Sequence, residues 1–216
     1  MPSTLPVRAV FFIDGSNWYH ALKKIGVRSD RLDYQKVARK LAEHREVRAI
    51  HYYVGALPRM PGQRNHPHTV RQREFLRELR AQGVQVFLGR VVRNYMPPNK
   101  NPAVETLRHL LAEERASLSE RAAEEIARLC RMPLPYYIEK QVDTRITADL
   151  IGMAHRGEYD AAYLLSADSD FVPALNEAKS RGKLVFAAGP GQSAQLAAAA
   201  DNFIRLKTDW FSGLRL

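Results

Sequence analysis

The sequence contains a single cysteine and no hydrophobic run long enough to span a membrane. One thiol, Cys130, excludes both an intramolecular disulfide and a zinc site made of several thiolates, and it is typical of a reducing compartment. Residues 1–8 also lack the apolar core of a secretion signal. We therefore expect a cytoplasmic protein without membrane association.

Two common catalytic motifs are missing as well. The chain has neither a Gly-Lys-Ser/Thr phosphate-binding loop nor the Ser, His and Asp order of a nucleophilic triad. Residues 189–194 formally match a dinucleotide-binding fingerprint, but they follow a late strand and hold a proline in the turn. A loop before a helix capped by Ser193 explains them better, and such a helix start would suit a phosphate of the substrate.

Positive charge, in contrast, is present in excess. Lys and Arg number 33 against 23 Asp and Glu, which gives a formal net charge of +10. This excess favours a polyanionic partner, most often a nucleic acid. The loop and helix after residue 57 contain arginines that we expect to contact phosphates: Arg59, Arg64, Arg71 and Arg73. A solvated helix face explains the helical pair equally well.

Short apolar runs alternate with helical patterns along most of the chain. Residues 9–13, 161–165 and 184–188 are such runs, and 47–57 and 84–92 are further strand candidates. An uninterrupted apolar run is typical of a strand that is buried on both faces of a parallel sheet. The alternation therefore predicts an α/β fold with a mainly parallel central sheet.

The pattern changes between residues 94 and 135, where a proline-rich break precedes two helical segments. We predict one domain, residues 1–216, with a helical hairpin inserted at about 94–135. The mixed charges of this hairpin favour plain structural packing. A lid, an RNA-contacting arm, and a surface for a protein partner or a second copy of the chain remain alternatives.

Acidic residues follow the predicted strands. Asp14 ends the run 9–13, Asp168 and Asp170 follow 161–165, and Asp143 stands at a helix start. Because the carboxyl ends of parallel strands meet at one edge of a sheet, these acids should lie together. Each could instead cap a helix, and Ser16 or Asn17 could cap the helix after Asp14. Clustered carboxylates are what Mg²⁺- or Mn²⁺-dependent hydrolysis of a phosphodiester requires.

The sequence resembles the NYN family, the LabA-like branch of the PIN-like nucleases. The resemblance lies mainly in residues 12–17 (Phe-Ile-Asp-Gly-Ser-Asn), 140–143 (Lys-Gln-Val-Asp) and 166–173 (Ser-Ala-Asp-Ser-Asp-Phe-Val-Pro). It extends to Asp149, to Gly-Lys at 182–183 and to residues 196–203. Together these motifs cover most of the chain except residues 94–135. The family often has glycine where Ala167 stands.

The resemblance implies a three-layer α/β/α fold, a Mg²⁺ or Mn²⁺ site and ribonuclease activity on RNA. It assigns the metal ligands and catalytic residues to Asp14, Asp143, Asp168 and Asp170. Asn17, Ser166 and Ser193 would position the substrate. Asp149 and Lys140 would contact the ligating carboxylates without touching the metal themselves.

Other readings of the same residues are possible. Asp14 to Trp18 is similar to a metal-dependent adhesion site, but Trp18 stands where that motif needs a serine. Toprim nucleases also have an acidic pair after a strand, but they need glutamate at the first strand, where Asp14 stands. The main alternative is an inactive NYN-fold protein that binds RNA or acts in a regulatory assembly.

Overall fold

A computed structural model describes residues 6–56, 67–191 and 193–216. The chain divides into two compact units. One comprises Met1–Arg90 with Lys140–Leu216, and the other comprises Val91–Glu139. We call them the α/β unit and the hairpin unit. Among the described residues, none of the helices has both the length and the apolar character needed to cross a membrane.

The sheet has seven strands in the order β4-β3-β2-β1-β5-β6-β7. The strands are β1 (Arg8–Asp14), β2 (Glu46–Gly55), β3 (Gln85–Met96), β4 (Leu134–Lys140), β5 (Ala161–Leu165), β6 (Leu184–Gly189) and β7 (Asn202–Arg205). All pairings from β3 through β2, β1, β5 and β6 to β7 are parallel, as predicted. Their carboxyl ends therefore point to one edge.

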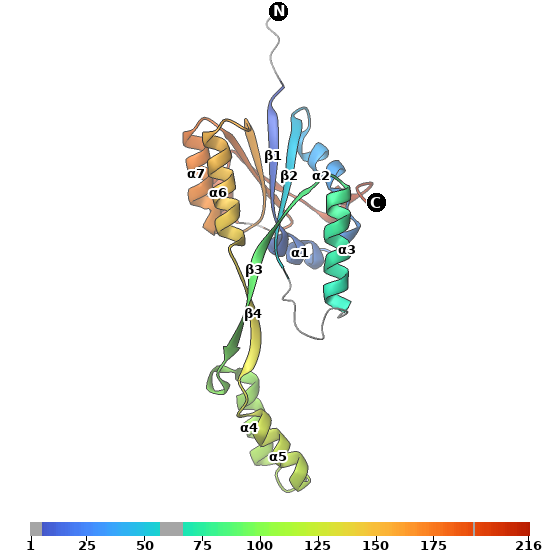
Figure 1. Cartoon of the computed structure of the whole chain (residues 1–216), viewed down its shortest axis with the longest axis vertical. Coiled ribbons are helices and arrows are strands. Elements are labelled where there is room, and N and C mark those ends of the chain that lie inside the picture. Colours follow the sequence, from blue (N-terminus) through green and yellow to red (C-terminus); the bar gives the residue numbers. More distant parts are fainter. Residues whose placement is uncertain (1–5, 57–66, 192) are drawn as a thin grey trace, which may run out of the picture. The chain divides into compact units, whose positions relative to one another are not determined.

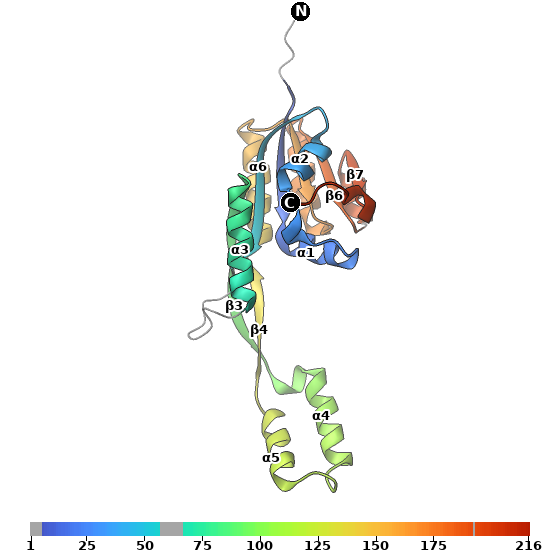
Figure 2. The same cartoon turned by 90° about the vertical axis from the view of Figure 1, so that its right-hand side faces the viewer.

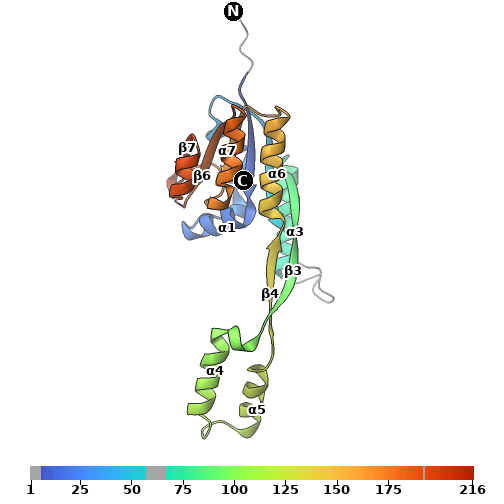
Figure 3. The same ribbon diagram turned by 90° about the vertical axis from the view of Figure 1, so that its left-hand side faces the viewer.

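Helices cover both faces of this sheet (Figures 2 and 3). One face packs α1 (Gly15–Lys24), α2 (Tyr34–Ala42) and α3 (Pro67–Ala81). The other packs α6 (Val142–His155), α7 (Val172–Ser180) and α8 (Ala194–Ala199). Along β1, Phe11 and Ile13 face the first layer whereas Val10 and Phe12 face the second, because successive strand residues point to opposite faces. The predicted three-layer α/β/α fold is confirmed.

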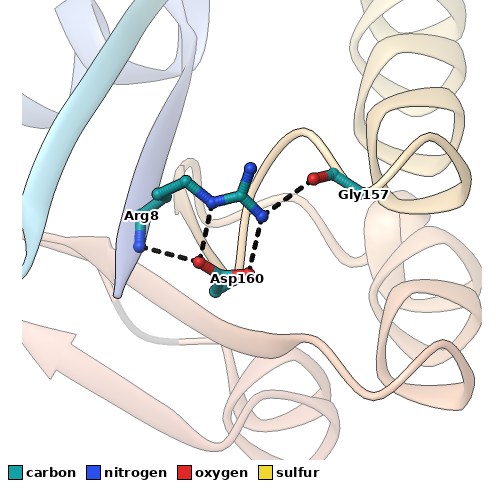
Figure 4. Close-up of polar contacts among 3 residues, drawn as sticks. All are labelled: Arg8, Gly157 and Asp160. Carbon is teal, nitrogen blue, oxygen red and sulfur yellow. Dashed lines mark hydrogen bonds and ion pairs between the residues drawn. The ribbon is translucent and has the colours of Figure 1, made fainter. Parts of the chain in front are cut away.

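An ion pair at the amino end of the sheet joins β1 to the turn before β5 (Figure 4). The Arg8 guanidinium donates from Nε and Nη2 to the two carboxylate oxygens of Asp160, over 2.9 and 2.8 Å. Nη2 also donates to the Gly157 carbonyl, and the pair holds the pKa of Asp160 at about 2. The strands then run in register from Ala9 opposite Ala161 to Ile13 opposite Leu165. Because of this register, the carboxyl ends of β1 and β5 lie next to each other at one edge of the sheet.

The hairpin unit contains the whole stretch of the predicted insertion, residues 94–135. It holds the outer part of β3, most of β4, the 3₁₀ turn Pro98–Lys100, α4 (Pro102–Glu113) and α5 (Glu120–Leu129), which lie side by side (Figure 1). The strand β3 runs to Met96 rather than ending near Val92, so it enters this unit. Asn94 Nδ2 donates to the Tyr136 hydroxyl over 3.0 Å across the ribbon.

Candidate active site at the carboxyl edge of the sheet

Asp14 is the last residue of β1 and also the N-cap of α1. Its Oδ1 accepts the backbone N–H of Asn17 over 3.1 Å, so the cap is Asp14 itself and neither Ser16 nor Asn17. Gly15 allows the chain to turn here: an added Cβ would lie 2.5 Å from Tyr52 Cε1 and 2.7 Å from the Tyr53 carbonyl oxygen. Only glycine fits so close to β2.

Hydrogen bonds tie the end of β1 to the loop after β5. Ser166 Oγ donates to Asp14 Oδ2 over 3.1 Å, and the same hydroxyl accepts the backbone N–H of Asp168. Asn17 Oδ1 accepts the backbone N–H of Ala167 over 3.1 Å. Two segments separated by about 150 residues are thereby held together. Ser166 is only 2% exposed, so its hydroxyl positions the acids rather than facing solvent.

The acids of the site interact electrostatically. Asp14 is 4% exposed, and burial raises its pKa against the opposing hydrogen bonds from Asn17 and Ser166, while Asp143 and Asp168 raise the pKa further. Burial also raises the pKa of Asp143, with added repulsion from Asp168 and Asp170. Asp143 and Asp168 therefore lie within electrostatic reach of Asp14, and Asp168 and Asp170 lie within reach of Asp143.

The loop after β5 is shaped by one of these acids. Asp168 Oδ1 accepts the backbone N–H of Asp170 over 3.0 Å and caps the 3₁₀ turn Ser169–Phe171, which leads into α7. Asp168 is partly buried whereas Asp170 is exposed. Ala167 has room in the turn because Gly191 lies opposite, where an added Cβ would come 3.4 Å from the Ala167 Cβ.

The donor chemistry fits a partly hydrated divalent cation. Within the described ranges, no three His, Cys, Asp or Glu side chains are grouped closely enough to enclose a metal ion. Mg²⁺ in proteins commonly keeps several waters and takes only one or two carboxylates directly. Asp14 and Asp143 supply oxygen donors whose charged forms are disfavoured by burial and by neighbouring acids, and a cation would offset both effects.

Two further predicted residues lie on neighbouring segments. Ser193 caps α8, where its Oγ accepts the backbone N–H of Leu196 over 3.3 Å. Lys140 is exposed at the end of β4, three residues before Asp143. Ser193 thus has a structural partner within the protein, and the Lys140 side chain is open to solvent.

Asp149 lies on a different side of α6 from Asp143. Six residues separate them, which places the two side chains about 120° apart around an α-helix. Asp149 Oδ2 accepts from Arg145 Nε over 2.7 Å and from the Tyr53 hydroxyl over 3.1 Å. Its hydrogen-bonding partners are therefore Arg145 and Tyr53, and sequence reasoning singled out neither.

The Tyr53 hydroxyl also bonds a buried histidine. His51 is 6% exposed, and its Nδ1 lies 3.1 Å from Tyr53 Oη. Because the hydroxyl donates its hydrogen to Asp149, it accepts from Nδ1–H of a neutral imidazole. Burial lowers the pKa of His51, which favours this neutral form. The alternating apolar pattern of β2 gave no signal for such a polar chain.

A groove of about 420 Å³ lies at the start of α6, and its lining includes Val142 and Thr144 but not Asp143 itself. It is lined by residues of β2, β3 and α6, among them Phe87, Leu88, Val142, Thr144 and Arg145. The Arg145 guanidinium lies over the Phe87 ring, 5.1 Å from its centre. An aromatic ring next to a cation can bind a nucleotide base and its phosphate.

The predicted phosphate-binding arginines fall in two groups. Arg71 and Arg73 are exposed on α3, while Arg59 and Arg64 lie outside the described residues. Arg77 and Arg80 are also exposed on α3. This helix therefore displays several cations on the surface of the α/β unit.

Comparison with known proteins agrees with these motifs and with the fold. No curated protein matches the sequence. A crystal structure of a protein of unknown function from Vibrio parahaemolyticus is similar in fold, with 22% identity, a TM-score of 0.59, and coverage of 97% of this chain and 98% of that chain. The family model for the NYN domain matches residues 8–207. The chain is therefore a member of the NYN domain family.

Proposed function

We propose that this protein is a Mg²⁺- or Mn²⁺-dependent ribonuclease that hydrolyses RNA phosphodiester bonds in the cytoplasm. NYN domains have a PIN-like nuclease fold, and this chain belongs to that family. The observation that carries the proposal is that the Ser166 hydroxyl bonds both Asp14 and the backbone of Asp168, while Asp143, from a third segment, lies close enough to raise the pKa of Asp14.

The proposed site uses its acids to hold the cation. Asp14, Asp143, Asp168 and Asp170 would provide oxygen ligands, directly or through water. A bound divalent cation lowers the pKa of water and neutralises charge on the scissile phosphate. Ser166 and Asn17 hold the end of β1 against the loop that carries Asp168, and the side-chain amide of Asn17 would orient the substrate or an attacking water.

The RNA would reach the acids along the basic α/β unit. Electrostatic attraction brings the strand to this surface, where Arg71 and Arg73 on α3 would bind phosphates. The groove at the start of α6 would then accept a nucleotide, with the Arg145 guanidinium against its base or its phosphate.

The direct test is cleavage of labelled single-stranded and structured RNA with Mn²⁺, Mg²⁺ or a chelator. We expect cleavage only with a metal, and we expect Asp14→Asn to abolish it. Asp33→Asn is the matched control, because Asp33 is likewise the N-cap of a helix in the α/β unit. Equal cleavage by Asp14→Asn and the wild type would refute the proposal.

One observation favours an inactive RNA-binding protein as the second candidate. Among the residues with described positions, the acids do not form a closed metal site. An inactive protein would bind RNA equally well with metal or chelator and would show no product with any RNA tested. Binding of Mn²⁺ can be measured as a rise in melting temperature. A rise in the wild type that is lost in Asp14→Asn would show a metal site, whereas RNA binding by charge alone would produce no such difference.

A further inference from the structure

Exposed apolar side chains are concentrated in the hairpin unit. Among the described residues, 13 large hydrophobic side chains are exposed, and eight of them lie within residues 91–139. They are Val92, Tyr95, Leu107, Leu110, Leu129, Met132, Leu134 and Tyr136. A cluster of this kind on a small unit marks an interaction surface rather than ordinary surface scatter.

The interior of the hairpin unit is very small. Of the side chains described in this unit, the fully buried apolar ones are Val104 on α4, Ala123 on α5 and Cys130, which caps α5. Cys130 Sγ lies 4.0 Å from the Val104 carbonyl oxygen, so these residues form the contact between the helices. Domains shorter than about 40 residues usually need a metal, a disulfide or association to be stable, and residues 91–139 form a unit only slightly longer than that.

The apolar surface lies on one side of the helix pair. Leu110 comes six residues after the buried Val104, and Leu129 comes six residues after the buried Ala123. Each leucine is therefore about 120° around its helix from the buried contact. Since the two helices run in opposite directions (Figures 2 and 3), equal offsets bring both leucines to the same side. Leu110 is 50% exposed and Leu129 is 45% exposed.

The charge of the hairpin unit indicates its partner. Residues 91–139 contain seven Lys or Arg and seven Asp or Glu, so the remaining residues hold 26 and 16 and carry the whole net charge of +10. A neutral surface gives no net attraction to RNA or to an acidic protein. Interspersed charges of both signs are compatible with an identical surface related by a two-fold axis.

We propose that the α4–α5 hairpin pairs with the hairpin of a second copy of this chain. The apolar side, centred on Leu110 and Leu129, would pack against its equivalent and form a four-helix bundle. The bundle would bury the leucines that each hairpin leaves exposed, and Arg and Glu side chains would lie at its rim.

Sedimentation velocity of the full-length protein over a range of concentrations tests this pairing, after nuclease treatment to remove bound RNA. We expect a species of twice the chain mass of 24.6 kDa, and we expect it to persist in molar salt because the contact is apolar. The variant with both Leu110→Glu and Leu129→Glu should have the single-chain mass at every concentration.

The matched control adds the same two charges to the α/β unit. Leu184→Glu with Leu216→Glu changes two exposed leucines outside the hairpin and should leave the mass doubled. Leu110→Ala with Leu129→Ala preserves helix propensity and should weaken the pairing by at least ~10-fold, which tests the contact should the charged variant unfold. Circular dichroism checks the fold of each variant.

Three outcomes would overturn the pairing. One is a wild type that has the single-chain mass at all concentrations, because the apolar side would then have some other partner than a second copy. Another is a dimer that survives both leucine variants. The third is a doubled mass that disappears on nuclease treatment, because RNA would then be the bridge.

Discussion

The α/β unit and the hairpin unit differ in how they use charge and apolar surface. The α/β unit buries aromatic and aliphatic side chains on both faces of its sheet and carries the whole formal net charge of +10. The hairpin unit is neutral, and its described residues include three fully buried apolar side chains and eight large exposed ones. A solvated basic surface suits a polyanion, whereas an apolar neutral one suits another protein surface. This difference is the basis on which we propose RNA binding by the first unit and self-association by the second.

The largest expected effect separates catalysis from binding within the α/β unit. Asp168→Asn retains the oxygen that accepts the Asp170 N–H but loses a negative charge. We expect cleavage to fall by at least ~100-fold, about 2.7 kcal/mol of transition-state stabilisation. RNA affinity should stay similar or become tighter, because one carboxylate fewer repels the phosphates. Cleavage rates and binding curves on one RNA measure both.

A loss of RNA binding in Asp168→Asn would contradict the assignment of this acid to catalysis. A melting temperature close to that of the wild type is the control for folding, since the cap of the turn Ser169–Phe171 depends on this side chain.

The next effect compares the two units as RNA-binding surfaces. We expect affinity for single-stranded RNA to fall steeply with salt, with a log-log slope of about −0.7 for each phosphate contacted. Arg71→Gln with Arg73→Gln on α3 should make the slope shallower by up to ~1.4, since two contacts are lost. Arg115→Gln with Arg121→Gln in the hairpin unit should leave it unchanged. Fluorescence anisotropy at several salt concentrations measures these slopes.

A salt profile that is flat for the wild type would remove the basic surface from the proposal. Equal changes of slope in the two arginine pairs would mean that both units contact RNA, and the contrast in their charge would then carry no functional meaning.

The smallest effect concerns how much the buried charge of Asp14 lowers the free energy of unfolding. The pKa of Asp14 is raised in the folded protein, so its ionisation at neutral pH opposes folding. Asp14→Asn keeps an oxygen for the Asn17 N–H but replaces the oxygen that accepts from Ser166. Because removal of the charge outweighs the loss of that one bond, we expect the free energy of unfolding to rise by up to about 1 kcal/mol at neutral pH. Urea unfolding monitored by circular dichroism measures the change.

The pH dependence gives this prediction its sign. The penalty is fully present above the raised folded pKa of Asp14 and disappears as the pH falls to the unfolded value of about 3.9. The gain of Asp14→Asn should therefore shrink on acidification. Asp33→Asn, a change at an exposed N-cap bond, should show no gain at neutral pH. A stability gain that stayed constant down to acid pH would have a cause other than the Asp14 charge.

The sequence predicted the fold and the edge at which the acids meet, because both depend on local patterns. Short apolar runs identified β1 and β5, and the acids directly after them had to share one edge of a parallel sheet. The cap of α1 stayed open among Asp14, Ser16 and Asn17, since all three have capping side chains and only the backbone path selects Asp14.

The contacts that hold the site together could not be predicted in the same way. The bonds from Ser166 to Asp14 and from Ala167 to Asn17 join residues about 150 positions apart. The bond from Tyr53 to Asp149 likewise depends on how α6 is rotated on the sheet. Such pairings arise only from tertiary packing, and periodicity carries no information about them.

The close approach at Gly15 also has a consequence for protein engineering. The backbone after Asp14 passes so close to β2 that a single methyl group would collide with Tyr52 and the Tyr53 carbonyl. The position of the Asp14 carboxylate therefore depends on the missing side chain of Gly15 as well as on its hydrogen bonds. Transplanting the four aspartates onto another parallel sheet would therefore not transfer the site. The recipient would also need a glycine directly after the first aspartate, packed against the neighbouring strand.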